Sequence, residues 1–213
     1  MKVLYAFLIA ALCISGSLLT KLQCTLKGGK TPKSWLDMVS PCTIMLEVQL
    51  RNETAAAMTY LAMGAHFARD TVNRPGFSKF FFTSANEERE HAIKIIEYLL
   101  MRGQLTSNRT LLEFPLKPLQ EEWENGLDAL TNALELEANI TRRIHSINRK
   151  CEKVSTRFTD YHVVDYLTEE FLDEQYKGER DLAGKISTLS KMNAMHGSLG
   201  EFLFDKKLLN GEV

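Results

Sequence analysis

Four stretches of the chain carry metal-binding residue types inside an apolar stripe that repeats every three or four positions. This spacing puts all members of a stripe on one face of a helix. The polar intruders are Glu53 in the first stretch, Glu88 and His91 in the second, Glu137 in the third and Gln175 in the fourth. A lone buried carboxylate is costly and tends to stay protonated, so several of them with an imidazole in one core require a cation. The sequence therefore predicts a metal site inside a helical protein.

Glu88 and His91 form the most specific local signal, within Asn86-Glu87-Glu88-Arg89-Glu90-His91. A spacing of three aims both side chains the same way, and an oxygen with a nitrogen ligand suits a divalent first-row metal. Taken alone, the spacing is weak evidence and is more typical of a solvated run of charges. The register favours the metal site, because both residues fall on the apolar stripe. Glu87 lies beside that stripe, where it can act as an outer ligand or meet water.

The composition is that of an ordinary globular chain. It has 213 residues, a formal net charge of −1, 45% hydrophobic residues and 25% charged residues, which suits one domain with a full-sized core. Because there is no basic run, we expect no nucleic acid as a partner. After the N-terminal segment no stretch stays apolar for long enough to span a bilayer, so we expect no membrane insertion.

The N-terminus has the pattern of a secretory signal peptide. Met1-Lys2 is a positive start, Val3 to Ile14 is an apolar run, and Ser15-Gly16-Ser17 supplies small residues. A membrane anchor is the alternative, which the shortness of the apolar run disfavours. We therefore expect residues 1–20 to be removed, at a bond between Ser17 and Gln23 that the sequence does not fix, and the protein to be secreted.

The remainder predicts four long helices and a short fifth. Ser40-Pro41 is a good helix start, and Gly103 is a usual helix stop. The short link at 71–76 makes the first two helices antiparallel neighbours, whereas the segment 104–119 is long enough to cross a whole bundle. The expected elements are an arm over 21–39, helices over about 40–70, 77–102, 120–150 and 161–192 that form a bundle over 40–192, and a short helix near 198–208 within the C-terminal segment 193–213.

Several motifs go further than this general plan and resemble those of ferritin. They are Asn86-Glu87-Glu88-Arg89-Glu90-His91-Ala92, Glu122-Trp123-Glu124-Asn125-Gly126-Leu127, Ala133-Leu134-Glu135-Leu136-Glu137, Asp173-Glu174-Gln175 and Glu201-Phe202-Leu203-Phe204-Asp205-Lys206. The resemblance covers roughly Thr43 to Leu208, and the signal peptide and N-terminal cysteines make it closest to secreted, insect-type ferritin subunits. It implies an all-α, ferritin-like four-helix bundle with a long crossover between helices two and three and a short C-terminal fifth helix.

The resemblance also implies a function. Ferritins store iron as a ferric mineral inside a hollow assembly of twenty-four subunits, and heavy-type subunits use O₂ to oxidise Fe²⁺ to Fe³⁺ at a di-iron site. The residues that match this ferroxidase centre are Glu53, Glu88 and His91 at the first iron, with Glu88 bridging, then Glu137 at the second iron with Glu87 and Gln175 beside it, and Tyr60 as a hydrogen-bonding tyrosine. Because only one imidazole is present, we expect the second position to bind iron more loosely.

The cysteines suggest a covalent framework. Cys13 leaves with the signal peptide, so the mature chain keeps Cys24, Cys42 and Cys151 in an oxidising compartment. An odd number leaves at least one free thiol or one bridge to another chain. Our hypothesis is that Cys42 and Cys151 pair within the chain and that Cys24 bridges to another subunit, which would suit a shell mixed with a light-type chain.

Two features qualify the resemblance. Ferritins of this type commonly line a three-fold iron channel with an Asp and a Glu three residues apart. Here Asp165 matches the Asp, but Thr168 occupies the position of the Glu. Asp165 is thus a channel candidate on a modified route. Of three N-glycosylation sequons, the one at Asn108 lies in the exposed crossover and is the candidate acceptor, because Asn52 and Asn139 lie within helices beside metal ligands.

Two other functions compete with this one. A secreted helical cytokine would also be a disulfide-linked bundle, but its up-up-down-down path needs two long crossovers. The short link after the first helix and the charges within the apolar stripes argue against it. A ferritin subunit that only stores iron would lack the ferroxidase ligands, which this chain retains. The sequence does not decide between a shell of this chain alone and a mixed shell.

Overall fold

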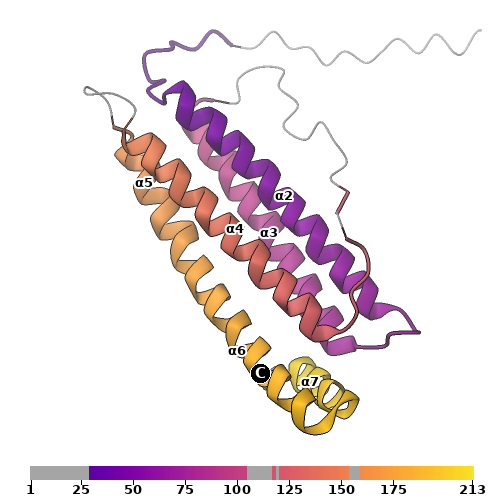
Figure 1. Cartoon of the computed structure of the whole chain (residues 1–213). Coiled ribbons are helices and arrows are strands. Elements are labelled where there is room, and N and C mark those ends of the chain that lie inside the picture. The colour runs from indigo at the N-terminus through magenta and orange to yellow at the C-terminus, as the bar shows by residue number, and fades with distance from the viewer. Residues whose placement is uncertain (1–28, 105–116, 119, 154–158) are drawn as a thin grey trace, which may run out of the picture. The chain divides into compact units, whose positions relative to one another are not determined.

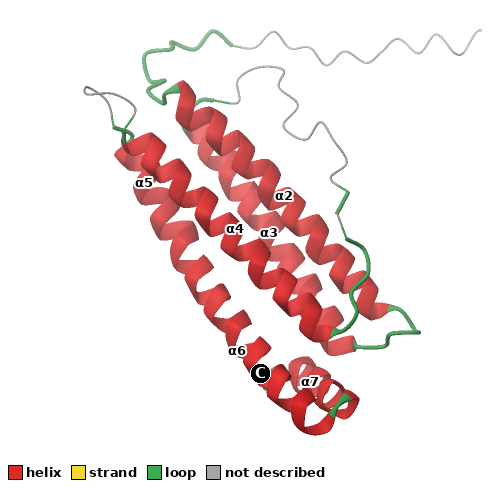
Figure 2. Cartoon of the chain, viewed as in Figure 1, coloured by secondary structure: helices red, strands yellow, loops and turns green. Residues whose placement is uncertain are grey.

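Four helical rods run side by side, and a shorter helix packs across one end of them (Figure 1). The computed structural model describes residues 29–104, 117–118, 120–153 and 159–213. All regular elements in these ranges are helices (Figure 2), and all lie within the unit Trp35–Val213. The helices are α2 (Ser40–Ala68), α3 (Pro75–Met101), α4 (Gly126–Glu152), α5 (Tyr161–Leu167), the π-helical turn η1 (Thr168–Leu172), α6 (Asp173–His196) and α7 (Ser198–Asn210).

The helix order confirms the predicted long crossover. The short link after Ala68 turns α3 back along α2, and the end of α3 meets the start of α2 where Thr43 Oγ1 donates to Gln104 Oε1 at 3.3 Å. Helix α4 begins at the opposite end, where the Gly126 amide donates to Glu201 of α7 at 2.9 Å. The connection from α3 to α4 must therefore cross the length of the bundle.

The fourth rod departs from the single helix expected over 161–192. It consists of α5, η1 and α6, and it runs on to His196 before Gly197 turns the chain with a φ of 56°. Its buried residues Val163, Leu167, Phe171 and Gln175 are spaced by four. A spacing of four overshoots the α-helical turn of about 3.6 residues, so the stripe would drift around the rod. The wider π-turn absorbs this drift and keeps the four residues facing the bundle.

Two helix starts also differ from the prediction. Helix α4 begins at Gly126 rather than near Gln120, because the Asn125 side chain accepts from the Asp128 amide at 2.9 Å and caps the helix there. Helix α2 has Val39 at its N-cap, without a side-chain cap, so Ser40 does not cap it as expected. Pro41 in the first turn, which has no amide hydrogen to satisfy, helps to start α2 instead.

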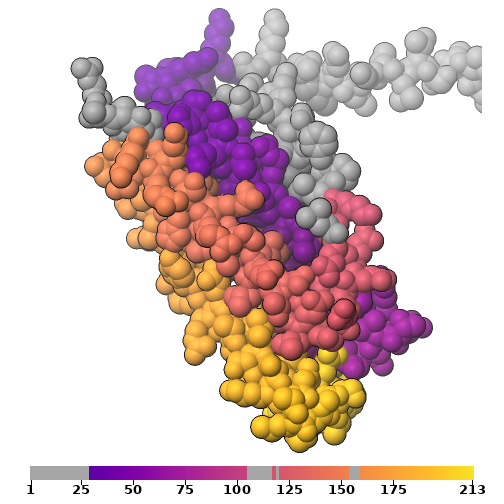
Figure 3. Space-filling model, in the orientation of Figure 1, coloured from indigo at the N-terminus to yellow at the C-terminus, as the bar shows by residue number. Residues whose placement is uncertain are grey.

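The apolar core consists of two clusters with a polar layer between them. One lies toward the start of α2 and includes Leu46, Ile95 and Ile144, and the other lies toward α7 and includes Phe77 and Phe204. In the space-filling view, α4 lies along α2. The last part of α6 and α7 lie together at one end of the bundle (Figure 3). Along each rod, the polar layer occupies the middle.

Helix α7 is fixed to the bundle by two acidic side chains. Asp205, which is fully buried, accepts hydrogen bonds from the amides of Gly76 and Phe77 at 2.7 and 3.1 Å. Glu201 accepts from Arg74 Nε at 3.1 Å and from the Gly126 amide at 2.9 Å. These contacts satisfy free N–H groups in the first turns of α3 and α4 and place negative charge at the positive ends of both helices.

The predicted disulfide between Cys42 and Cys151 is confirmed, with a Cα–Cα distance of 5.5 Å. It joins the first turn of α2 to the last turn of α4. The signal peptide over 1–20, Cys24 and the sequon Asn108 lie outside the described residues. Each helix in the described ranges is too short or too polar to cross a membrane.

Candidate metal centre

Each of the four rods contributes at least one predicted ligand to the polar layer. Glu53 comes from α2, Glu88 and His91 from α3, Glu137 from α4 and Gln175 from α6. All are buried, from Glu53 with no exposed surface to Glu137 with 8%. Each replaces an apolar residue in its stripe, and the apolar clusters on both sides bring the four rods together at this level. The structure thus gathers the predicted residues into one layer.

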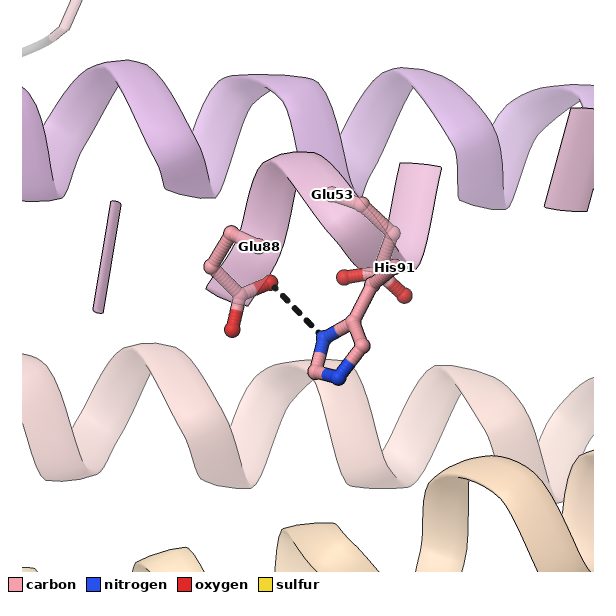
Figure 4. Close-up of side chains that lie close together, drawn as sticks. All are labelled: Glu53, Glu88 and His91. Atoms are coloured by element: carbon pink, nitrogen blue, oxygen red, sulfur yellow. Dashed lines mark ion pairs between the residues drawn. The ribbon is translucent and has the colours of Figure 1, made fainter. Parts of the chain in front are cut away.

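Three of these residues meet closely enough to share one ion. Glu53, Glu88 and His91 each place a ligand atom within 4.8 Å of the others. Figure 4 shows the two side chains of α3 converging with that of Glu53, with His91 Nδ1 lying 3.6 Å from Glu88 Oε2. Two carboxylates and an imidazole are a donor set for a divalent first-row metal.

The atoms that face this point lack protein partners. Glu53 Oε2, Glu88 Oε2 and His91 Nδ1 are buried and make no hydrogen bond within the described part of the chain. Buried polar atoms are normally paired, and each orphan costs free energy. The three orphans point to the same place, so a bound cation would satisfy all of them at once.

A second half of the layer is held by hydrogen bonds. Tyr60 donates its phenolic hydrogen to Glu137 Oε1, and Gln175 Nε2 donates to Glu137 Oε2 at 2.7 Å. Both oxygens of Glu137 are therefore fixed, and its carboxylate is oriented within the layer. These residues face a common pocket of about 110 Å³ together with two members of the trio, Glu88 and His91.

The mouth of the pocket is acidic. Glu87 and Glu174 line it from α3 and α6, whereas Asp181, which also lines it, pairs with Lys185 at 2.7 Å. Glu87 is exposed, as expected for an outer ligand or a residue that meets water. Burial, and then the nearby Glu174 carboxylate, raise the pKa of Glu87. An acidic mouth attracts cations from solvent.

Burial dominates the electrostatics of the layer. It raises the pKa of Glu53 and of Glu88 well above their ordinary value, and the neighbouring carboxylates Glu88 and Glu137, respectively, raise them further. Burial also raises the pKa of Glu137, although the hydrogen bonds from Tyr60 and Gln175 oppose this. The pKa of Tyr60 is raised in the same way, so its phenol stays a donor. Carboxyls in this state hold protons until a cation replaces them.

Two residues of the centre were missed by the sequence analysis. Gln49 donates from Nε2 to Glu53 Oε1 at 2.7 Å, and its signal was its position one turn before Glu53 on the same stripe. Glu174 Oε2 lies 3.1 Å from His91 Nε2. Because Glu174 is half exposed and lies off the apolar stripe, nothing in the periodicity of the sequence marked it.

The channel positions Asp165 and Thr168 and two other histidines lie elsewhere. Asp165 is exposed on α5, and Thr168 is exposed at the start of η1, where its hydroxyl accepts from Asn148 Nδ2 at 3.3 Å. His66 is buried against Phe67 and Trp123, and His162 contacts the Tyr98 hydroxyl through Nδ1 at 3.0 Å. None of the four belongs to the polar layer.

Comparison with known proteins identifies one family. A family model described as a ferritin-like domain matches residues 45–192. The ferritin heavy chain of Papilio xuthus is 51% identical over 207 residues, which is 97% of this chain and 98% of the relative, and that of Trichoplusia ni is 49% identical over 205 residues, 96% of this chain and 95% of the relative. The crystal structure of secreted ferritin from Trichoplusia ni is 50% identical, with a TM-score of 0.84, and the match covers 90% of this chain and all of the other.

Proposed function

Because the chain belongs to the ferritin family, we propose that the polar layer in the middle of its bundle is a ferroxidase centre. The protein stores iron, and its enzymatic step is the oxidation of Fe²⁺ to Fe³⁺ by O₂. The observation that carries the assignment to this layer is the meeting of Glu53, Glu88 and His91 with three unpaired, buried ligand atoms.

We assign the ligands to two neighbouring Fe²⁺ positions. Glu53, Glu88 and His91 bind the first, and Glu88 bridges to the second, because it belongs to the trio and also lines the pocket with Glu137. Glu137 is the main ligand of the second position, with Gln175 and Glu87 beside it. The second position has no imidazole, and both Glu137 oxygens already accept hydrogen bonds from protein. It therefore binds iron more loosely, which suits passage of the oxidised product.

The iron ions at the two positions supply the electrons for O₂ reduction, and the carboxyl groups supply negative charge. Two Fe²⁺ ions lose one electron each, and one O₂ gains both electrons with two protons to become hydrogen peroxide. The buried carboxyls give up their protons as iron binds, so anionic oxygens offset the growing charge on the iron. Fe³⁺ then reacts with water, and the resulting ferric oxyhydroxide is deposited as mineral.

The initial rate of aerobic Fe²⁺ oxidation tests this assignment. Replacing the bridging residue, Glu88→Ala, should abolish the fast phase, because it removes a ligand of both ions. Glu90→Ala is the matched control, since Glu90 lies on the same helix but is exposed and pairs with Arg89. An unchanged rate in Glu88→Ala would refute the centre, and bound iron with no fast phase in the unmodified protein would instead make this a storage-only subunit. A cytokine would neither bind nor oxidise iron.

The family forms shells of several subunits, and we propose the 24-mer for this chain, with a light-type chain as an additional partner. A Cys24 bridge to that partner is part of the proposal, and non-reducing electrophoresis that gives only monomer-sized bands would refute it. Secretion is proposed too, supported by the pattern at residues 1–20 and by the secreted relative from Trichoplusia ni.

Entry of iron is proposed to pass Asp165. It is exposed on the fourth rod, and the carboxylates of Glu169 and Glu170 follow it closely in the chain. Because Thr168 contributes no charge and Glu170 pairs with Lys94 at 3.4 Å, Glu169 is the neighbouring acidic group left to attract Fe²⁺ there. Asp165→Asn should slow iron uptake into the shell while leaving the affinity of the centre for Co²⁺ unchanged.

A further inference from the structure

The outer nitrogen of His91 is held by a carboxylate that no ligand assignment includes. Glu174 Oε2 lies 3.1 Å from His91 Nε2, on the side of the ring away from Glu88. We propose that Glu174 is a positioning residue of the centre, which keeps the imidazole proton on Nε2 and leaves Nδ1 free to bind metal. This inference rests on the proposed ferroxidase centre.

The two ring nitrogens have different surroundings. Nδ1 faces Glu88 at 3.6 Å, is buried and has no hydrogen-bond partner within the described residues, whereas Nε2 meets Glu174. A neutral imidazole has one N–H and one lone pair, and a carboxylate can only accept. A proton on Nε2 donated to Glu174 therefore directs the lone pair on Nδ1 toward Glu53 and Glu88. Metal-binding histidines are commonly fixed in this way by an outer carboxylate.

Glu88 competes with Glu174 for the proton of the His91 ring. Glu88 lies beside Nδ1, and even when protonated it keeps one oxygen that accepts, so without Glu174 the metal-free ring can place its proton on Nδ1 and donate it to Glu88. That arrangement would block the lone pair and occupy the bridging ligand in one contact. Only a small shift of the ring is needed, because Nδ1 already lies 3.6 Å from Glu88 Oε2.

The π-turn η1 explains how Glu174 reaches this position. Consecutive residues of a helix point about 100° apart, so Glu174 and Gln175 cannot share one target. Gln175 reaches Glu137 on α4, while Glu174 reaches His91 on α3. The fourth rod thus contacts both neighbouring helices with adjacent side chains. Because η1 ends directly before Asp173, it sets the rotation at which α6 presents this pair.

Titration of the metal-free assembled protein with Co²⁺, followed by visible absorption, tests the role of Glu174. Co²⁺ is a redox-stable probe for a site with nitrogen and oxygen ligands. Glu174→Ala should weaken binding at the first position by roughly 10- to 100-fold, the usual cost of losing an outer partner of a metal ligand. Glu174→Gln keeps a carbonyl oxygen that accepts from Nε2, so it should restore most of the affinity.

Asp173→Asn is the matched control for charge. Asp173 precedes Glu174, is exposed and pairs with Lys177 rather than with the centre, so its loss should leave Co²⁺ binding unchanged. If Glu174→Gln binds as weakly as Glu174→Ala, the charge of Glu174 matters rather than its hydrogen bond, and the proposal is wrong. Unchanged binding in Glu174→Ala would overturn it as well.

Two further measurements separate this inference from the ferroxidase assignment. Glu88→Ala in the same titration should lose Co²⁺ at the first position, and if it does not, the centre itself is misassigned. If Glu88→Ala fails to bind while Glu174→Ala binds normally, only the role of Glu174 is wrong. A crystal structure of metal-free Glu174→Ala should show His91 Nδ1 moved to hydrogen-bonding distance from Glu88, and an unmoved ring would contradict the proposal.

Discussion

The phenol of Tyr60 donates a hydrogen bond to Glu137 across the bundle, although the two residues are 77 positions apart in the chain. The bond joins α2 to α4 and fixes one oxygen of the main ligand of the second metal position. Both partners are buried. Hydrogen bonds to charged groups contribute about 1.5–3 kcal/mol, which is the scale of effect that Tyr60 can have on the centre.

Tyr60→Phe removes only this hydrogen bond. We expect the initial rate of Fe²⁺ oxidation to fall by roughly ten-fold, because Glu137 would be less well oriented and its free oxygen would be unsatisfied. Stopped-flow absorbance of the ferric product measures the rate. Tyr166→Phe is the matched control, since that hydroxyl donates to the Lys94 carbonyl at 3.0 Å, away from the pocket. A larger loss in the control than in Tyr60→Phe would contradict the assignment.

The buried carboxyls predict that the metal-free protein is less stable at neutral than at acidic pH in the range where they titrate. Folded Glu53 and Glu88 keep their protons above the ordinary pKa of 4.5, at which the same groups ionise in the unfolded chain. The folded state then binds more protons, so the free energy of unfolding falls as the pH rises above about 4.5. Chemical denaturation of the metal-free protein from about pH 5 to about pH 7 measures this slope.

A divalent cation should reverse that slope. Zn²⁺ replaces the protons and binds only the folded protein, so its stabilising effect should grow as the pH rises. Zn²⁺ titrations monitored by thermal unfolding measure the effect. The double variant Glu53→Gln, Glu88→Gln is the control, because the two replaced side chains do not titrate. Its stability should fall less steeply with pH, since Glu137 remains, and Zn²⁺ should stabilise it much less. A slope of the same size in the double variant would show that other groups cause it.

The disulfide between Cys42 and Cys151 predicts a large effect on stability and a small one on catalysis. It closes a loop with a sequence separation of 109, and chain-entropy arguments give about 4.7 kcal/mol for a loop of that order, of which about 2–4 kcal/mol is typically observed. Cys42→Ala with Cys151→Ala should therefore lower the free energy of unfolding by that smaller amount. Guanidinium denaturation measures it, and an unchanged midpoint would contradict the prediction. The rate of Fe²⁺ oxidation should be retained, because neither cysteine lies in the polar layer.

Asp205→Ala should destabilise the protein by about 2 kcal/mol. It removes the acceptor of two amides at the start of α3 and leaves them buried. Asp205→Asn keeps an acceptor oxygen and should cost clearly less. Comparing the two variants by denaturant unfolding separates loss of the cap from loss of charge, and equal destabilisation would show that charge alone matters.

The residues of the centre were largely predictable because each interrupts an apolar stripe. Glu53, Glu88, Glu137 and Gln175 occupy stripe positions, so the same periodicity that predicts their helices also predicts their burial. Glu174 escaped because its side chain reaches the centre from an off-stripe position, which depends on the rotation of α6 against α3. That rotation is a tertiary property, and no single helix encodes it.

Helix boundaries were predictable where one residue controls them and not where two features compete. Gly103 ends α3 with a φ of 70°, as its lack of a side chain suggested. The start of α4 was predicted too early, near Gln120, because the sequence analysis did not weigh the cap at Asn125, which decides the start. In the fourth rod, buried residues spaced by four were compatible with a continuous helix, and only packing against the bundle requires the π-turn.

The cap on α3 makes the order of synthesis matter. The amides of Gly76 and Phe77 have their acceptor in Asp205, which is translated 129 positions after Gly76. A nascent chain therefore cannot complete the α3 end of its bundle until nearly all of it has been translated. Truncation before Asp205, by a premature stop codon or a protease, should leave a subunit whose α3 amides exchange rapidly with solvent, which hydrogen exchange would reveal.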